Sequence, residues 1–123
     1  MAGAGWASTE RLIELGGSAV EGMLFEQYFD RFDAAPKFQG FLQAYRDRFK
    51  TEAGFGAVLA YDAANMIIAG LQKTDQPVAL KAAILALGQF DGVQNPILLD
   101  AMGDVTRAVH FGVVKQGTFA KID

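Results

Sequence analysis

The segment from Ala57 to Lys73 constrains the fold more than any other part of the chain. Apolar residues fill most of it, and only Asp62 and Asn65 interrupt the run from Ala57 to Leu71. A helix that is apolar around most of its circumference must be buried on several sides. The run is shorter than the roughly 20 residues that a membrane span needs, so we expect a buried helix and no transmembrane segment.

The composition makes the same demand for burial. Hydrophobic residues form 51% of the 123 residues before the 14 glycines are counted, which exceeds the roughly 45–50% of average soluble domains with glycine included. Such a surplus of apolar residues needs a partner surface, and the length supports one domain at most.

With 11 Lys and Arg against 14 Asp and Glu, the net charge is −3. We therefore expect no nucleic-acid partner, because a basic surface is missing.

The chain lacks the residue combinations of common catalytic and metal sites. It has no cysteine, which excludes disulfides, thiolate zinc sites and cysteine nucleophiles. His110 is the only histidine, and neither Ser8 nor Ser18 lies in a Gly-x-Ser-x-Gly elbow. Gly3-Ala4-Gly5 and Gly54-Phe55-Gly56 each supply only the first two glycines of a dinucleotide fingerprint. We expect no enzyme activity, no cofactor and no metal, and a structural or solvent-facing role for His110.

The N-terminal third predicts a helix, a strand and a connection. Met1 to Trp6 lacks the basic and apolar regions of a secretory signal. Ser8 as N-cap predicts a short helix over Thr9–Leu15. The apolar run Ala19–Phe25, interrupted by a Glu-Gly pair, predicts a buried strand with a bulge. The charged segment Tyr28–Ala35 is expected to be a connection.

Further helices are expected after Pro36. Apolar residues recur there at helical spacing opposite charged residues, which predicts a surface amphipathic helix whose aromatic stripe belongs to the core rather than to a partner site. The Ala57–Lys73 helix follows, and Pro77 introduces a helix over Val78–Leu87 that Gly88 ends. The stripe consists of Phe38, Phe41, Leu42, Tyr45 and Phe49.

Strands are predicted in the C-terminal part. Pro96–Leu99 is a short apolar run, and residues 109–113 alternate apolar side chains with His110 and Gly112. A Gln-Gly turn then leads into a hairpin with Thr118–Ile122. Asp100–Asp104 lacks the spacing of a calcium loop, so we expect a turn there.

Five short motifs follow one another in a specific order and spacing. They are Gly17–Met23, Pro36–Tyr45, Ala60–Ala63, Asp91–Asp104 and Val113–Gly117. Together they resemble the C-terminal part of type I periplasmic solute-binding proteins of the branched-chain amino acid (Leu/Ile/Val) family, the receptors of ABC importers. One departure is the Gly-Val-Gln-Asn-Pro-Ile stretch from Gly92, where the family more often has a second glycine.

The resemblance implies an α/β chain that is a fragment of a bilobal fold, with three main helices and a few strands. Residues 1–123 would form a single incomplete domain, in which 1–29 and 108–123 belong to the second lobe and 34–100 to the first. Crossovers between the lobes would fall near Tyr28–Asp33 and Asp100–Arg107. Helices meant to cover an absent parallel sheet would have open faces, so we expect self-association to complete the fold.

The implied function is the receptor component of an ABC importer for branched-chain or related amino acids or small carboxylates. Its partners would be that ligand and a membrane permease, and its location would be periplasmic. We do not expect the fragment to bind ligand alone. Two alternatives stay open: a ligand-sensing regulatory domain of the same fold, and a small helical interaction protein.

Four residues are candidates for ligand binding. The resemblance implies that Glu21, beside Gly22, takes the ammonium group of the ligand, and that Trp6 and Tyr61 line the cleft. The residues themselves agree for Glu21, because an ionised carboxylate within an apolar strand is costly unless it is paired. The alternative for Glu21 is a bulge or edge position that is open to water.

Overall fold

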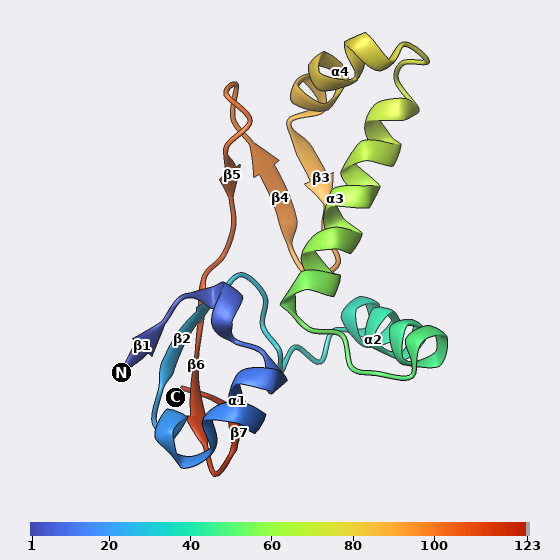
Figure 1. Cartoon of the computed structure of the whole chain (residues 1–123). Helices are drawn as coiled ribbons and strands as arrows, with labels where there is room; N and C mark the ends of the chain where they lie inside the picture. Colours follow the sequence, from blue (N-terminus) through green and yellow to red (C-terminus); the bar gives the residue numbers. More distant parts are fainter. Residues whose placement is uncertain (123) are drawn as a thin grey trace.

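Two α/β parts, joined by two crossovers, make up the computed structural model, which describes residues 1–122 (Figure 1). The four-stranded part comprises residues 1–27 and 110–122, and the helical part comprises residues 36–99. We call residues 28–35 the first crossover and residues 100–109 the second crossover. The first and the last described residues both lie in the four-stranded part.

The helices are α1 (Glu10–Gly16), α2 (Pro36–Phe49), α3 (Phe55–Leu71) and α4 (Leu80–Leu87), with 3-10 turns at Gly5–Ala7, Gly17–Val20 and Pro77–Ala79. The strands are β1 (Ala2–Gly3), β2 (Leu24–Gln27), β3 (Gln89–Asp91), β4 (Pro96–Leu99), β5 (Val105–Thr106), β6 (His110–Lys115) and β7 (Thr118–Lys121). They form a sheet in the order β1-β2-β6-β7 and a second sheet in the order β3-β4-β5.

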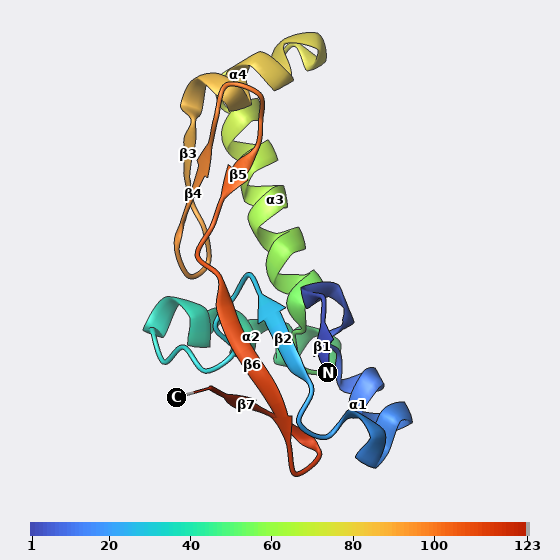
Figure 2. The ribbon, with the colours of Figure 1, turned by 90° about the vertical axis from the view of Figure 1, so that its left-hand side faces the viewer.

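The four-stranded sheet has one parallel pair and two antiparallel pairs. β1 runs parallel to β2, while β2 and β6, and β6 and β7, are antiparallel (Figure 2). Its core is built from Val20, Phe25 and Val114, against which α1 packs. The rings of Phe25 in β2 and Phe119 in β7 meet edge to face at 5.7 Å between centroids, so aromatic packing links two strands that lie on either side of β6.

The helical part is organised along α3. Its buried cluster contains Phe38 of α2, Val58 of α3 and Val93 from the β3–β4 loop, together with Phe29 from the first crossover. At the other end of α3, α4 approaches so closely that a Cβ on Gly70 would lie 2.6 Å from Ile84 Cγ1. Glycine is therefore needed at this helix contact.

Most of the predicted elements are confirmed. All four helices form where expected, and β4, β6, β7 and the hairpin turn also match. The Asp100–Asp104 segment is a turn, in which Asp100 Oδ1 accepts hydrogen bonds from the amides of Met102 and Asp104 at 2.8 and 2.9 Å.

Two local predictions in the N-terminal third are wrong. The N-cap of α1 is Thr9, whose hydroxyl accepts from the Leu12 amide at 3.2 Å, whereas the Ser8 hydroxyl donates to the carbonyl of Gly5. The expected strand over Ala19–Phe25 is largely absent, because residues 17–20 form a 3-10 turn and β2 begins at Leu24. The two glycines at the end of α1 let the chain continue as a tight turn instead of an extended strand.

The expected burial of α3 on several sides is also wrong for the described residues. Only Val58, Asp62 and Gly70 of α3 are buried, while Ile68 and Leu71 are half exposed, at 51% and 50%. Residues 1–122 contain nothing that covers this apolar face. Within the same residues, no helix combines the length and the apolar character of a membrane span.

Candidate functional site

The carboxyl ends of β1 and β2 lie side by side, because the two strands are parallel. The chain leaves β1 into the 3-10 turn that carries Trp6, and it leaves β2 through Tyr28 into the first crossover. In open α/β sheets, ligands bind outside the carboxyl ends of parallel strands. This edge of the sheet is therefore the first place to look for a site.

A close backbone contact positions Trp6 at this edge. A Cβ on Gly5 would lie 2.6 Å from the carbonyl oxygen of Glu26, so the turn can approach β2 only with glycine there. The Ser8 hydroxyl fastens the turn by donating to the Gly5 carbonyl at 2.6 Å. As a result Trp6, the only tryptophan of the chain, stands out from the turn with 73% of its surface exposed.

Two neighbouring hollows open at this edge. The Trp6 hollow has a volume of about 190 Å³, and the crossover hollow, which extends to the second crossover, has about 670 Å³. Glu26, Tyr28 and Leu59 line both, so the two hollows lie next to each other. The Trp6 hollow also touches Ala4, Gly5, Trp6, Ser8, Gln27, Phe29 and Phe55, and the crossover hollow touches Val105, Thr106, Arg107 and Val109.

The lining combines aromatic and aliphatic surface with one carboxylate. Glu26 is half-buried, and within residues 1–122 its carboxylate has neither an ion pair nor a hydrogen bond. Trp6, Tyr28 and Leu59 supply the apolar surface around it. Such a site can hold a small molecule that has an ammonium group and an apolar side chain, since a carboxylate forms strong charge-assisted hydrogen bonds.

The second crossover is fixed to the helical part by a buried ion pair. Asp62 of α3 is 4% exposed, and its Oδ2 lies 3.1 Å from Nη1 of Arg107. Its other oxygen accepts from the Val93 amide at 2.8 Å. Arg107 is also one of the residues that line the crossover hollow.

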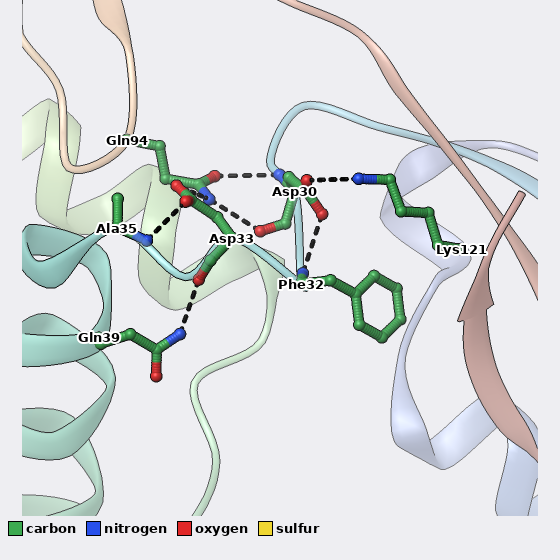
Figure 3. A network of polar contacts seen from close by, with 7 residues as sticks. All are labelled: Asp30, Phe32, Asp33, Ala35, Gln39, Gln94 and Lys121. Carbon is green, nitrogen blue, oxygen red and sulfur yellow. Dashed lines mark hydrogen bonds and ion pairs between the residues drawn. The ribbon is translucent and has the colours of Figure 1, made fainter. Parts of the chain in front are cut away.

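The first crossover is fixed to the same loop by a side-chain amide (Figure 3). Gln94 Oε1 accepts from the Asp30 amide at 3.0 Å, and Gln94 Nε2 donates to the Asp30 carbonyl at 2.7 Å and to Asp33 Oδ2 at 2.9 Å. The adjacent residues Val93 and Gln94 thus connect both crossovers to one point of the helical part.

The Asp30 side chain reaches in the opposite direction, toward the four-stranded part. Its Oδ1 accepts from the Phe32 amide at 2.9 Å, and its Oδ2 lies 3.3 Å from Lys121 Nζ. Burial raises the pKa of Asp30, but the Phe32 hydrogen bond, Lys121 and the charge of His110 together outweigh this, so the pKa lies below its usual value. The carboxylate is therefore ionised in the folded chain near neutral pH.

The four candidate residues from the sequence do not come together. Trp6 lies at the hollow that bears its name, whereas Tyr61 packs on Phe41, with ring centroids 4.9 Å apart, and lines another hollow beside Lys37. Glu21 lies at the β6–β7 turn, where its two carboxylate oxygens accept from the amides of residues 116 and 117 at 2.7 and 3.3 Å. Gly22 has a φ of 73° and donates to the Val114 carbonyl.

The geometry therefore gives Glu21 a structural partner and leaves its ligand-binding role without support in the described hollows. The sequence reasoning missed Glu26 and Arg107. The available signal for Glu26 was an acidic residue just before the predicted connection. Glu26 was missed because the predicted strand ended at Phe25, whereas β2 ends two residues later, at Gln27.

Comparison with known proteins extends this picture. No family model matches the sequence, and no curated protein matches it. Among solved structures, a leucine-binding protein of Thermotoga maritima matches 99% of the chain with a TM-score of 0.86 and 25% sequence identity, and the chain covers 36% of that protein. A substrate-binding protein of an ABC transporter from Desulfitobacterium hafniense, in complex with Leu, matches 84% of the chain with a TM-score of 0.76 and 26% identity, over 32% of its own length.

A more distant structure shares the fold. The branched-chain amino acid transporter substrate-binding protein of Streptococcus pneumoniae, in complex with isoleucine, matches 96% of the chain with a TM-score of 0.85 at 20% identity. The chain spans about a third of the length of these relatives. Over nearly all its residues it is thus similar to one third of a bilobal solute-binding protein of the branched-chain amino acid type, the family that its sequence motifs indicate.

Proposed function

We propose that the chain is part of the substrate-binding component of an ABC importer for branched-chain or related amino acids or small carboxylates. The observation that carries the proposal is the fold similarity over 99% of the chain to a leucine-binding protein. The hollow at the ends of β1 and β2 supports it, because an unpaired carboxylate and apolar side chains meet there.

In this proposal the four-stranded part belongs to the second lobe and the helical part to the first. The ammonium group of an amino acid binds to Glu26, and its side chain lies against Trp6, Tyr28 and Leu59. The remaining two thirds of such a receptor supply the other contacts. The chain alone therefore binds with a dissociation constant no better than roughly millimolar, since each 1.4 kcal/mol of lost contacts weakens binding about tenfold.

The same proposal places the receptor outside the cytoplasmic membrane, where it delivers its ligand to a permease. Small carboxylates stay within the proposed ligand range because a structure of similar fold, from R. palustris, is a complex with benzoate. Leucine carries an ammonium group and benzoate does not, so the two ligands separate the role of Glu26 from that of the apolar wall.

Fluorescence of Trp6 tests the proposal, because this is the only tryptophan of the chain. Titration with leucine or isoleucine should give a saturable change in the millimolar range, whereas glucose should give none. Glu26→Gln should weaken leucine at least tenfold, as expected for loss of a charge-assisted hydrogen bond, and should leave benzoate unchanged. Glu21→Gln is the matched control and should leave both ligands unchanged.

Two outcomes would contradict the proposal. A response to leucine no different from that to glucose would remove the hollow from ligand binding. If Glu21→Gln lost leucine binding while Glu26→Gln kept it, Glu21 rather than Glu26 would bind the ammonium group.

A further inference from the structure

A separate hollow lies between β2, the first crossover and the β6–β7 hairpin. We call it the Gln27–His110 hollow. It has a volume of about 190 Å³ and shares only Gln27 with the Trp6 hollow. This volume exceeds the ~30 Å³ that one water molecule occupies in the liquid. Its lining consists of Gln27, Asp30, Phe32, His110, Phe111, Lys121 and Ile122.

Strand register brings the polar members of this lining together. Gln27 of β2 is directly opposite His110 of β6, so their side chains share one face of the sheet. Lys121 is opposite Gly112, two residues further along β6 and hence on the same face. Phe25 and Val114 lie on this face as well and are fully buried. This face of the sheet is therefore apolar at Phe25 and Val114 and polar near the first crossover, where Gln27 and His110 lie.

Two buried nitrogen atoms at this polar end have no hydrogen-bond partner among residues 1–122. Gln27 is 5% exposed, and its Nε2 has no hydrogen bond. His110 Nε2 is also buried and unpaired. Nearly all buried polar groups in native proteins are satisfied, and each unsatisfied one costs about 1–3 kcal/mol. The hollow therefore offers a free donor, Gln27 Nε2, to an occupant that presents a hydrogen-bond acceptor.

The rim carries one ammonium group, that of Lys121, beside one carboxylate, that of Asp30. Asp30 is already neutralised, since it accepts from the Phe32 amide and pairs with Lys121 at 3.3 Å. Figure 3 shows Lys121 and the Phe32 ring on the side of Asp30 away from Gln94. The Lys121 ammonium has further donors to offer, and Phe32 and Ile122 supply apolar surface.

We propose that the Gln27–His110 hollow binds a small carboxylate of the size of acetate. One oxygen accepts from Gln27 Nε2 and from His110, the other accepts a charge-assisted hydrogen bond from the Lys121 ammonium group, and the methyl group rests on Phe32 and Ile122. This site is distinct from the Trp6 hollow and does not depend on the function proposed for it.

NMR of the imidazole of His110 tests the site in the full 123-residue chain, because no other histidine contributes signals. Sodium acetate, titrated at constant pH and ionic strength, should shift the imidazole resonances saturably with a dissociation constant of millimolar order. Acetamide has the same shape without the charge and should give no saturable shift. Trp6 fluorescence, followed in the same samples, separates this event from binding at the Trp6 hollow.

Variants identify the groups that bind the carboxylate. Gln27→Met keeps the side-chain length but removes the donor, and should weaken acetate binding at least tenfold. Gln72→Met makes the same change at an exposed end of α3 and should have no effect. Should Gln27→Met not fold, Lys121→Gln is the second variant, because its side chain is 62% exposed; it should weaken binding several-fold.

Three results would overturn the proposal. A linear acetate response would mean that the hollow holds water only. Equal affinity for acetamide would exclude recognition of the negative charge. Undiminished acetate binding in both Gln27→Met and Lys121→Gln would place the carboxylate elsewhere.

Discussion

Replacing Arg107 should destabilise the fold strongly, because within residues 1–122 Arg107 is the only charged group that pairs with the buried carboxylate of Asp62. The side chains of Asp62 and Arg107 are 5% and 18% exposed. Breaking such a pair from one side costs about 3–5 kcal/mol, since it leaves a buried charge. Asp62 keeps the Val93 amide as a donor, so Arg107→Met should lower the free energy of unfolding by about 3 kcal/mol.

The partner variant should cost less. Asp62→Asn retains an oxygen for the Val93 amide, and the guanidinium that it leaves behind still reaches water. We expect a loss of about 1–2 kcal/mol, typical of a single hydrogen bond. The double variant contains no buried charge, so its cost should fall short of the sum of the two single costs by at least 1 kcal/mol.

Urea unfolding, followed by circular dichroism at one protein concentration, measures these free energies. Arg48→Met is the matched control, because Arg48 is exposed on α2 and has no ion pair among the described residues; its effect should stay within about 0.5 kcal/mol. Strict additivity of the Asp62 and Arg107 variants, or a cost for Arg107→Met no larger than for the control, would refute the reasoning.

Three further predictions follow from other contacts. In Gly5→Ala the added Cβ would collide with the Glu26 carbonyl. This variant should therefore lower the free energy of unfolding by about 1–3 kcal/mol, a typical cost of overpacking. It should also change the Trp6 emission spectrum, and an unchanged spectrum would contradict this. Because the pKa of Asp30 is lowered in the folded chain, its ionised form stabilises the fold. This stabilisation is complete at pH values above the ordinary pKa of 3.8, and it is lost as the pH falls from there through the lower pKa of the folded state. The difference in stability between the wild type and Asp30→Asn should therefore be constant near neutral pH and shrink below about pH 4; a difference that persists at pH 2 would argue against it. The open face of α3, with Ile68 half exposed, should make the chain self-associate, so light scattering should give a mass above that of one chain and Ile68→Lys should lower it.

Patterns that depend on neighbours along the chain predicted most of the fold. The periodicity of Phe38, Phe41 and Tyr45 predicted α2, and the alternation around His110 predicted β6, because each pattern reflects one buried face. The two-residue strand β1 could not be predicted in this way. It is too short to show alternation and exists only because β2 lies beside it.

The candidate site was predicted less well, because it depends on side-chain partners that are distant in sequence. Glu21 looked like a costly charge within a strand, but its partners are amides 95 and 96 residues further along the chain. Asp62 looked like an interruption of an apolar helix, and its partner Arg107 lies 45 residues away. Only the folded arrangement shows which carboxylate is already satisfied and which, like that of Glu26, has no ion pair or hydrogen bond within residues 1–122.

The insertion of the helical part between β2 and β6 has a consequence for the kinetics of folding. Leu24 pairs with Val113, so the sheet cannot close until a loop of about 90 residues has been brought together, at a large cost in chain entropy. Contacts within α2, α3 and α4 are local and form fast, whereas pairing of this kind is slow. The C-terminal hairpin should therefore be the last element to dock, and the time before it docks is when the unpaired edge of β2 is exposed to other chains.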